Sequence, residues 1–303
     1  MKGISIHLTD QCNQSCKFCV VNSYQERKES VNLKLIRAFL EENKDKGYEC
    51  VNMHGGEPSL VPELIEILTY IRDLGYPCVS MQTNGHTLSD KNFAKQLVDL
   101  NVKLFVVSFH HIRKEEIADL ANVDEKWLEE IIQGIKNVQA LGAKVRTNTV
   151  LYKNNLAEFP EIIDYIAKNL GVKRINISAM HPTGRAYQNF EEVVPTYTEI
   201  ASLAMQAVDK YDGKDQVKIS LEGFPPCMIP GYEKNIVDWY DIDYKLLYHS
   251  FVLDSYAEFM SNSTKEKGEV CEHCKYKDDR LCGGIYKEYI EKYGWNEFTN
   301  PIQ

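Results

Sequence analysis

Short apolar runs alternate with longer amphipathic stretches through the first two thirds of the chain. The short runs predict strands, because four to eight apolar residues between turn signals suit a buried strand. The longer stretches predict helices, since apolar residues such as Leu64, Ile67 and Ile71 recur at helical spacing. The predicted strands are 4–8, 50–54, 79–83, 104–109, 145–151 and 174–180, and the predicted helices are 33–46, 60–74, 90–100, 125–141 and 156–170.

This alternation predicts an α/β fold with right-handed crossovers and a parallel sheet. A closed barrel of this kind has eight strand–helix units, so six units predict a partial (β/α)6 TIM-type barrel. A helix is expected over 196–211 and an extended piece over 217–221, after which the alternation stops. We therefore predict two domains: a barrel over 1–215 and a smaller C-terminal domain over 216–303.

Polar residues follow the predicted strands directly. The C-terminal ends of parallel strands meet at one edge, where ligands bind in folds of this class. Three histidines at these ends, His54, His110 and His111, are candidate catalytic residues. For each of them the alternative is a hydrogen-bonded loop histidine with no role in chemistry.

Three cysteines follow the first predicted strand with the spacing CxxxCxxC: Cys12, Cys16 and Cys19. Three thiolates on one loop can hold three corners of a 4Fe–4S cluster, because cysteine sulfur is the usual protein ligand of cluster iron. The fourth iron then has an open coordination position. The alternative is a zinc knuckle, but structural zinc sites have four ligands, and no fourth ligand is evident nearby in the sequence.

With Phe18 directly before its last cysteine, this motif resembles the signature of the radical S-adenosylmethionine (radical SAM) enzymes. The resemblance implies that the open iron binds the amino and carboxylate groups of SAM. It also implies one-electron cleavage of SAM to a 5′-deoxyadenosyl radical, which removes a hydrogen atom from the substrate. A partial barrel is the fold that the resemblance implies.

The sequence Gly55-Gly56-Glu57-Pro58 follows the second predicted strand. Glycines let a backbone approach a ligand closely, and the carboxylate can pair with an ammonium group. The sequence is similar to the GGEP motif of the same family, which contacts the amino group of SAM. The resemblance further implies that Asn148 contacts the ribose or carboxylate of SAM. Thr83 has two interpretations, a similar contact or a place in a plain turn.

The last third of the chain contains a second group of cysteines. Four thiolates suit either a fully ligated 4Fe–4S cluster or a tetrahedral zinc ion. The arrangement resembles the C-terminal twitch or SPASM-type extension of radical SAM enzymes, which implies one auxiliary 4Fe–4S cluster. An alternative for the first cysteine is a hydrogen-atom donor that faces the substrate. The four residues are Cys227, Cys271, Cys274 and Cys282.

Two further cysteines, Cys50 and Cys78, lie at the start of buried strands, and we interpret them as small core residues without chemistry. A composition of 44% hydrophobic and 26% charged residues in 303 residues is that of a globular protein with a sizeable core. The net charge of −9 argues against a nucleic-acid or membrane-surface partner. The chain contains no apolar run long enough to span a membrane.

Nine cysteines in a chain that starts without a signal-peptide pattern predict metal ligation in a reducing compartment, the cytoplasm. Many relatives with such C-terminal extensions modify ribosomally made peptides. The resemblance therefore favours peptide modification by crosslinking or epimerisation, with flavodoxin or ferredoxin as external electron donor. One alternative is oxidation or rearrangement of a small molecule, a sugar or a cofactor precursor. A non-catalytic iron–sulfur electron carrier would explain the cysteines but not the GGEP sequence.

Overall fold

The computed structural model describes residues 3–24, 31–237, 244–279 and 281–298, and they form an α/β fold with a mostly parallel sheet, as predicted. The chain divides into two compact units, and each is built from three separate segments. Unit 1 comprises Met1–Cys16, Val21–Thr147 and Ile242–Ser255. Unit 2 comprises Lys17–Val20, Asn148–Asp241 and Tyr256–Gln303. The predicted boundary at 215/216 stays a prediction.

The sheet of unit 1 has the strand order β4-β3-β2-β1-β8-β9. Its neighbours are parallel except for β8 and β9, which form an antiparallel hairpin. The first strand is buried on both faces, with Ile4 and Ile6 fully buried on one of them, as expected for a central strand of a parallel sheet. The strands are β1 (Gly3–Thr9), β2 (Cys50–Gly55), β3 (Val79–Thr83), β4 (Val102–Ser108), β8 (Tyr244–Tyr248) and β9 (Phe251–Leu253).

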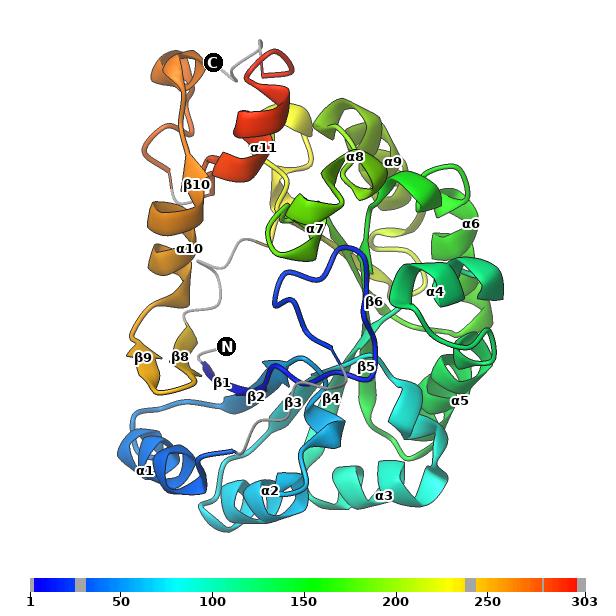
Figure 1. Cartoon of the computed structure of the whole chain (residues 1–303), viewed down its shortest axis with the longest axis vertical. Coiled ribbons are helices and arrows are strands. Elements are labelled where there is room, and N and C mark those ends of the chain that lie inside the picture. Colours follow the sequence, from blue (N-terminus) through cyan, green and yellow to red (C-terminus); the bar gives the residue numbers. More distant parts are fainter. Residues whose placement is uncertain (1–2, 25–30, 238–243, 280, 299–303) are drawn as a thin grey trace. The chain divides into compact units, whose positions relative to one another are not determined.

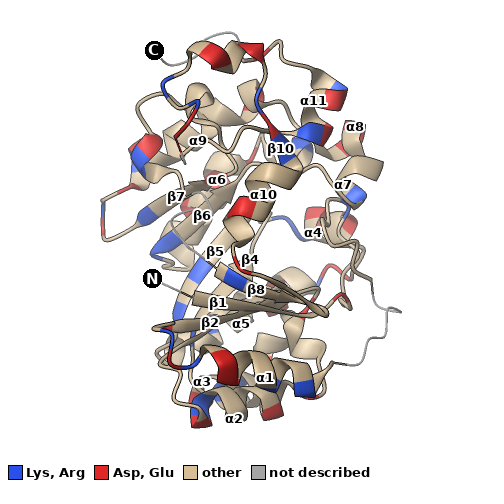
Figure 2. Ribbon diagram, turned by 90° about the vertical axis from the view of Figure 1, so that its left-hand side faces the viewer, with Lys and Arg blue, Asp and Glu red and all other residues tan. Residues whose placement is uncertain are grey.

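Helices α1, α2 and α3 lie along one side of the strands of unit 1 (Figure 1), and Figure 2 shows acidic and basic residues on them. Two helices of this unit start at a side-chain cap, α1 at Asn32 and α3 at Asp90. Asp90, for example, accepts hydrogen bonds from the amides of Asn92 and Phe93 at the start of α3. The helices of this unit are α1 (Leu33–Asn43), α2 (Leu64–Asp73), α3 (Lys91–Asp99), α4 (Lys114–Ala121) and α5 (Trp127–Ala140).

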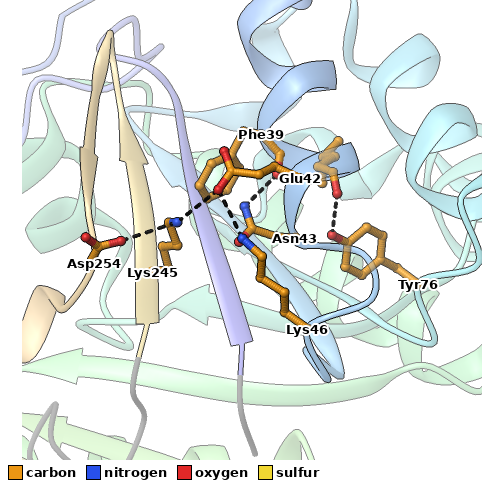
Figure 3. Close-up of polar contacts among 8 residues, drawn as sticks. Phe39, Glu42, Asn43, Lys46, Tyr76, Lys245 and Asp254 are labelled. Atoms are coloured by element: carbon orange, nitrogen blue, oxygen red, sulfur yellow. Dashed lines mark hydrogen bonds and ion pairs between the residues drawn. The ribbon is translucent and has the colours of Figure 1, made fainter.

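Charged groups join the β8–β9 hairpin to α1 (Figure 3), and the hairpin is also held by the ladder between β8 and β1. Lys245 Nζ of β8 lies 3.5 Å from Glu42 Oε1 of α1 and 3.3 Å from Asp254 Oδ1. Lys46 also donates to Glu42 Oε1 over 3.0 Å. These contacts attach a late segment of the chain to the first strand and first helix.

Unit 2 contains the parallel pair β6–β7 and the short antiparallel pair β10–β11. Its longest helix starts with a capping box, in which Thr196 and Glu199 bond each other's backbone amides. Strand β5 (Lys144–Val150) ends in this unit. The other elements are β6 (Arg174–Ser178), β7 (Lys218–Glu222), β10 (Lys265–Glu266), β11 (Ile285–Tyr286), α6 (Phe159–Asp164), α7 (Arg185–Gln188), α8 (Phe190–Val193), α9 (Tyr197–Tyr211), α10 (Tyr256–Thr264) and α11 (Lys287–Tyr293).

All the predicted strands and helices form, with two corrections. The predicted helix 60–74 starts at Leu64, because Pro58–Leu60 is a separate short turn. The predicted helix 156–170 is α6 followed by a π-helical turn, Tyr165–Asn169. The expected extended piece at 217–221 is a further sheet strand, β7. None of the described helices has both the length and the apolar composition to cross a bilayer.

Candidate functional site

The loop that carries the first cysteines leaves β1 and is held by backbone hydrogen bonds within unit 1. The amide of Cys12 donates to the carbonyl of Tyr24 over 3.3 Å, and that of Ser15 donates to Ala121 over 2.8 Å. Cys12 is buried and Cys16 is half-buried. Backbone bonds at both ends therefore fix the loop that presents these two thiols.

The two glycines of the GGEP sequence allow this loop to pack against the end of β1. The amides of Gly56 and Glu57 donate to the carbonyls of Thr9 and Gln11 over 2.6 and 2.8 Å. A Cβ atom on Gly56 would lie 2.2 Å from the Gln11 carbonyl oxygen, and one on Gly55 would lie 2.3 Å from that of Thr9. The lack of side chains thus serves a contact inside the protein, between the GGEP loop and the residues just before Cys12.

Glu57 is completely buried, and its carboxylate is directed into the protein. One oxygen accepts from the Ser59 amide over 3.0 Å and from the Thr83 hydroxyl over 2.9 Å, and the other accepts from the Asn84 amide over 2.7 Å. Burial raises the pKa of this carboxyl group, and the hydrogen bonds oppose that shift. The side chain therefore ties the GGEP loop to the end of β3, and its contact with an ammonium group stays a prediction.

Asn84 is a site residue that the sequence analysis did not single out. Its side-chain amide donates to Asn13 Oδ1 over 2.7 Å and lies 3.9 Å from Cys12 Sγ. A hydrogen-bond donor beside a thiolate stabilises the charged form and tunes a bound cluster. The available signal was the position of Asn84 at a strand end, but the Thr-Asn-Gly sequence also suits a plain turn.

In unit 2, Asn148 belongs to a polar network on neighbouring strands. Its Oδ1 accepts from Asn176 Nδ2 over 2.9 Å and from Ser178 Oγ over 2.8 Å. Glu222 Oε2 accepts from the same two groups over 2.6 and 3.3 Å. Because its oxygen is used in this network, Asn148 is oriented with its amide nitrogen available as a donor.

Phe18 and Cys19, from the last part of the cysteine loop, belong to unit 2. The Cys19 carbonyl accepts from the Arg185 amide over 3.0 Å, and a Cβ atom on Gly184 would come within 2.6 Å of that carbonyl oxygen. The Phe18 ring is buried, with its centroid 5.5 Å from that of Tyr152. Phe18 therefore has a packing role, and a part for it in cofactor binding, which its place in the cysteine motif implies, stays a prediction.

The three candidate catalytic histidines are buried or largely so. Burial, with a smaller contribution from His7, lowers the pKa of His54 to about 3, and burial lowers that of His110 to about 4. Both rings are therefore neutral near pH 7. His111 Nδ1 accepts from the amide of Arg113 over 3.1 Å. His111 therefore fits the role of a hydrogen-bonded loop histidine, while His54 belongs to strand β2, and a catalytic role for any of the three stays a prediction.

The four C-terminal cysteines line one cavity of unit 2, with Trp295 and Phe298 among the other lining residues. Burial, with smaller contributions from the other three cysteines, raises the pKa of Cys227 to about 12. Burial also raises the pKa of Cys282, while the charges of Lys267 and Lys265 oppose that shift. Thiols such as Cys227 and Cys282, whose thiolates are destabilised by burial, suit a site where bound metal supplies the compensating positive charge.

The family model described as "Radical SAM superfamily" matches residues 6–166, more than half of the chain. The chain belongs to the radical SAM superfamily. This family implies a 4Fe–4S cluster and SAM, in agreement with the donor set of the first cysteine loop. The family membership and the relatives support the expectation of an enzyme.

Two relatives that are similar in sequence share the same name, which states an enzymatic activity. A "Probable GTP 3',8-cyclase" of Saccharolobus islandicus (strain M.14.25 / Kamchatka #1) is 30% identical over 217 residues, which are 70% of this chain and 69% of the relative. The protein of the same name from Saccharolobus solfataricus is 32% identical over 200 residues, 63% of this chain and 61% of the relative.

Solved structures of radical SAM enzymes share the fold. The structure of Streptococcus suis SuiB bound to S-adenosylmethionine matches with a TM-score of 0.70 at 16% identity. The match covers 96% of this chain and 74% of the SuiB chain. The structure of anSMEcpe with bound AdoMet matches with a TM-score of 0.64 at 14% identity. This match covers 95% of this chain and 90% of the anSMEcpe chain. The predicted partial-barrel fold is thereby confirmed.

The expectation of peptide modification was wrong. It depended on the resemblance of the C-terminal cysteines to a twitch or SPASM-type extension, and that extension itself stays a prediction. The relatives at 30–32% identity are named for a reaction of GTP, a small molecule. SuiB has also been solved bound to the precursor peptide SuiA, but it is only 15% identical to this chain, and that likeness concerns the fold alone.

Proposed function

We propose that this chain is a radical SAM enzyme that acts on a small molecule, with the cyclisation of GTP as the first reaction to test. The observation that carries the proposal is the 30% identity over 217 residues to a relative named "Probable GTP 3',8-cyclase". This similarity spans more of the chain than the family model does, since the latter ends at residue 166.

In this proposal Cys12, Cys16 and Cys19 hold the 4Fe–4S cluster. The placement of Cys12 and Cys16 on a hydrogen-bonded loop, with the Asn84 amide beside Cys12, supports that role. When bound, the cluster and SAM supply a 5′-deoxyadenosyl radical that removes a hydrogen atom from the substrate. The chain's own share is to hold the ligands in place and to keep water away from them.

We assign SAM to the strand ends beside this loop. The backbone of Gly55 and Gly56 lines the approach, and Glu57 with Thr83 keeps that backbone in position. Asn148 contributes its amide nitrogen as a donor, since its oxygen is held by Asn176 and Ser178. Phe18 supports the last part of the cysteine loop through Tyr152.

We assign an auxiliary 4Fe–4S cluster to the four cysteines of the C-terminal cavity. All four line the same cavity, so Cys227 is included as a ligand instead of a hydrogen-atom donor. Structural zinc is the competing occupant, because tetrahedral zinc takes the same four thiolates. The proposal also includes an external electron donor such as flavodoxin or ferredoxin and a reducing compartment, the cytoplasm.

The test is an anaerobic turnover experiment. Reconstituted protein is mixed with SAM, GTP and a low-potential reductant, and 5′-deoxyadenosine and GTP are followed by chromatography. The expected result is release of 5′-deoxyadenosine together with consumption of GTP. In one control ATP replaces GTP, and the ATP should not be consumed. In the other control the Cys12→Ala variant should neither release 5′-deoxyadenosine nor consume GTP. Release of 5′-deoxyadenosine without loss of GTP would overturn GTP as substrate. Absence of 5′-deoxyadenosine from a fully loaded protein would overturn the radical mechanism.

A further inference from the structure

Cys50 and Cys78 face each other on neighbouring strands of unit 1. Cys50 is the first residue of β2, Cys78 directly precedes β3, and Val51 pairs with Val79 one position later. The two Sγ atoms are 3.2 Å apart. Neighbouring strands lie about 4.8 Å apart, within the range of about 4.4–6.8 Å that Cα atoms of disulfide-bonded cysteines take. The backbone therefore permits a bond between these two sulfurs.

The two thiols have different surroundings. Cys50 is 7% exposed, whereas Cys78 is half-buried and can be reached from solvent. The Cys50 thiol donates a hydrogen bond to Cys78 Sγ. This bond, with the charges of Lys103 and Lys144, lowers the pKa of Cys78 to about 7, and it raises the pKa of Cys50.

We propose that Cys50 and Cys78 are a redox-active dithiol that a small-molecule disulfide converts to an intramolecular disulfide, with Cys78 as the attacking sulfur. The interpretation of both residues as core cysteines holds for the buried Cys50 but not for the half-buried Cys78, and the proposal departs from it by assigning chemistry to the pair. Sequence spacing did not predict the pair, because 28 residues separate the two cysteines and only the strand register brings them together.

The reaction balances in two exchange steps. The Cys78 thiolate attacks one sulfur of oxidised glutathione, forms a mixed disulfide and releases one glutathione thiolate. Cys50 then loses its proton and attacks Cys78 Sγ, which releases the second glutathione. Two protein thiols are oxidised to one disulfide, and one glutathione disulfide is reduced to two thiols.

This site is separate from the proposed cofactor site on the same strands. Glu57 follows the far end of β2, and Thr83 is the last residue of β3. Each strand rises about 3.3 Å per residue, so its length alone separates the dithiol from that end by roughly 15 Å. The inference therefore goes beyond the proposed function and does not depend on the substrate.

The experiment uses the anaerobic protein with its clusters loaded. Oxidised glutathione is added, remaining thiols are alkylated with N-ethylmaleimide, and peptides are analysed by mass spectrometry. We expect one new crosslinked species that joins the peptides of Cys50 and Cys78 and is two hydrogens lighter than the reduced pair, with iron content unchanged. Full alkylation of both residues after this treatment would overturn the proposal.

Matched single variants identify the attacking sulfur. Cys50→Ser should accumulate a glutathione adduct on Cys78, whereas Cys78→Ser should leave Cys50 unmodified. In the unmutated protein, which needs no variant to fold, iodoacetamide at pH 7 should modify Cys78 at least about tenfold faster than Cys50, because the thiolate is the nucleophile. Equal rates, or an adduct on Cys50 in the Cys78→Ser variant, would contradict the assigned order.

Discussion

The buried carboxylate of Glu57 accepts a hydrogen bond from the Thr83 hydroxyl over 2.9 Å and thereby joins the loop after β2 to the end of β3. Its other oxygen accepts from the Asn84 amide over 2.7 Å. Glu57, for which the family resemblance implies a contact with SAM, is thus a structural link between two strand ends. This link and the predicted contact with SAM can be separated by experiment.

Glu57→Gln should lower the free energy of unfolding by about 1–3 kcal/mol, because an amide group would place a donor against N–H or O–H donors in a buried site. The measurement is anaerobic urea unfolding of the loaded protein. Thr83→Val is the matched control and should cost about 1 kcal/mol, since it removes the hydroxyl while preserving shape. An unchanged unfolding free energy with weakened SAM binding would instead show that the charge of Glu57 serves the cofactor alone.

Gly56→Ala should reduce the iron bound at the first cysteine loop. The added Cβ would lie 2.2 Å from the Gln11 carbonyl oxygen, and that backbone leads directly to Cys12. Iron analysis after anaerobic reconstitution checks the effect. Gly75→Ala is the control, because its Cβ would meet nothing within 4 Å and it costs only the strain of a left-handed backbone. Equal iron loss in both variants would refute a specific effect of Gly56 on the loop.

Cys227→Ala should remove iron from the C-terminal cavity and leave the N-terminal cluster in place. Two 4Fe–4S clusters predict about eight irons per chain, and loss of one cluster leaves about four. Iron and zinc are both measured by elemental analysis. The triple variant of Cys12, Cys16 and Cys19 to alanine gives the complementary result, about four irons on the C-terminal cysteines. If that triple variant retains zinc and almost no iron, the cavity is a zinc site.

His110 should make the protein less stable in mild acid. Its pKa is about 4 in the folded chain against an ordinary 6.5, so between these values the unfolded state binds one more proton. The contribution of His110 to the free energy of unfolding is fully present above pH 6.5 and is lost as the pH drops towards 4. From pH 7 to pH 5 the contribution is about 2 kcal/mol. Urea unfolding at the two pH values should show a loss that is about 2 kcal/mol smaller in His110→Gln and His110→Phe than in the unmutated protein, because the buried His54 contributes to the loss in all three. An equal loss in all three would contradict the assignment.

Much of the fold could be predicted because its information is local. Apolar runs such as Ile4–Ile6 and the helical spacing of Leu64, Ile67 and Ile71 specify buried faces from neighbouring residues alone. The hairpin of β8 and β9 was missed, since its ladder with β1 joins residues more than 200 positions apart. Helix α4 was missed because it is a single short segment between two stronger patterns.

The site divides in the same way. The cysteine spacing and the GGEP sequence carry their chemistry within a few residues, so they were recognised from sequence. The residues that contact these motifs were not recognised from sequence, because they come from other strands. They are Asn84 beside Cys12, and Asn176 with Glu222 around Asn148. These partners are Asn, Ser and Glu residues of kinds found on any surface, and only the strand register selects them.

The pairing of β8 with β1 has a consequence for any shortened form of this protein. A chain cut at residue 215 would keep β1 but lose the neighbour that satisfies its backbone along Gly3–His7. An exposed row of unsatisfied amides and carbonyls is a template for joining strands from other molecules. Expression of the first 215 residues should therefore give aggregates, because the chain returns to complete its own first strand only near residue 244.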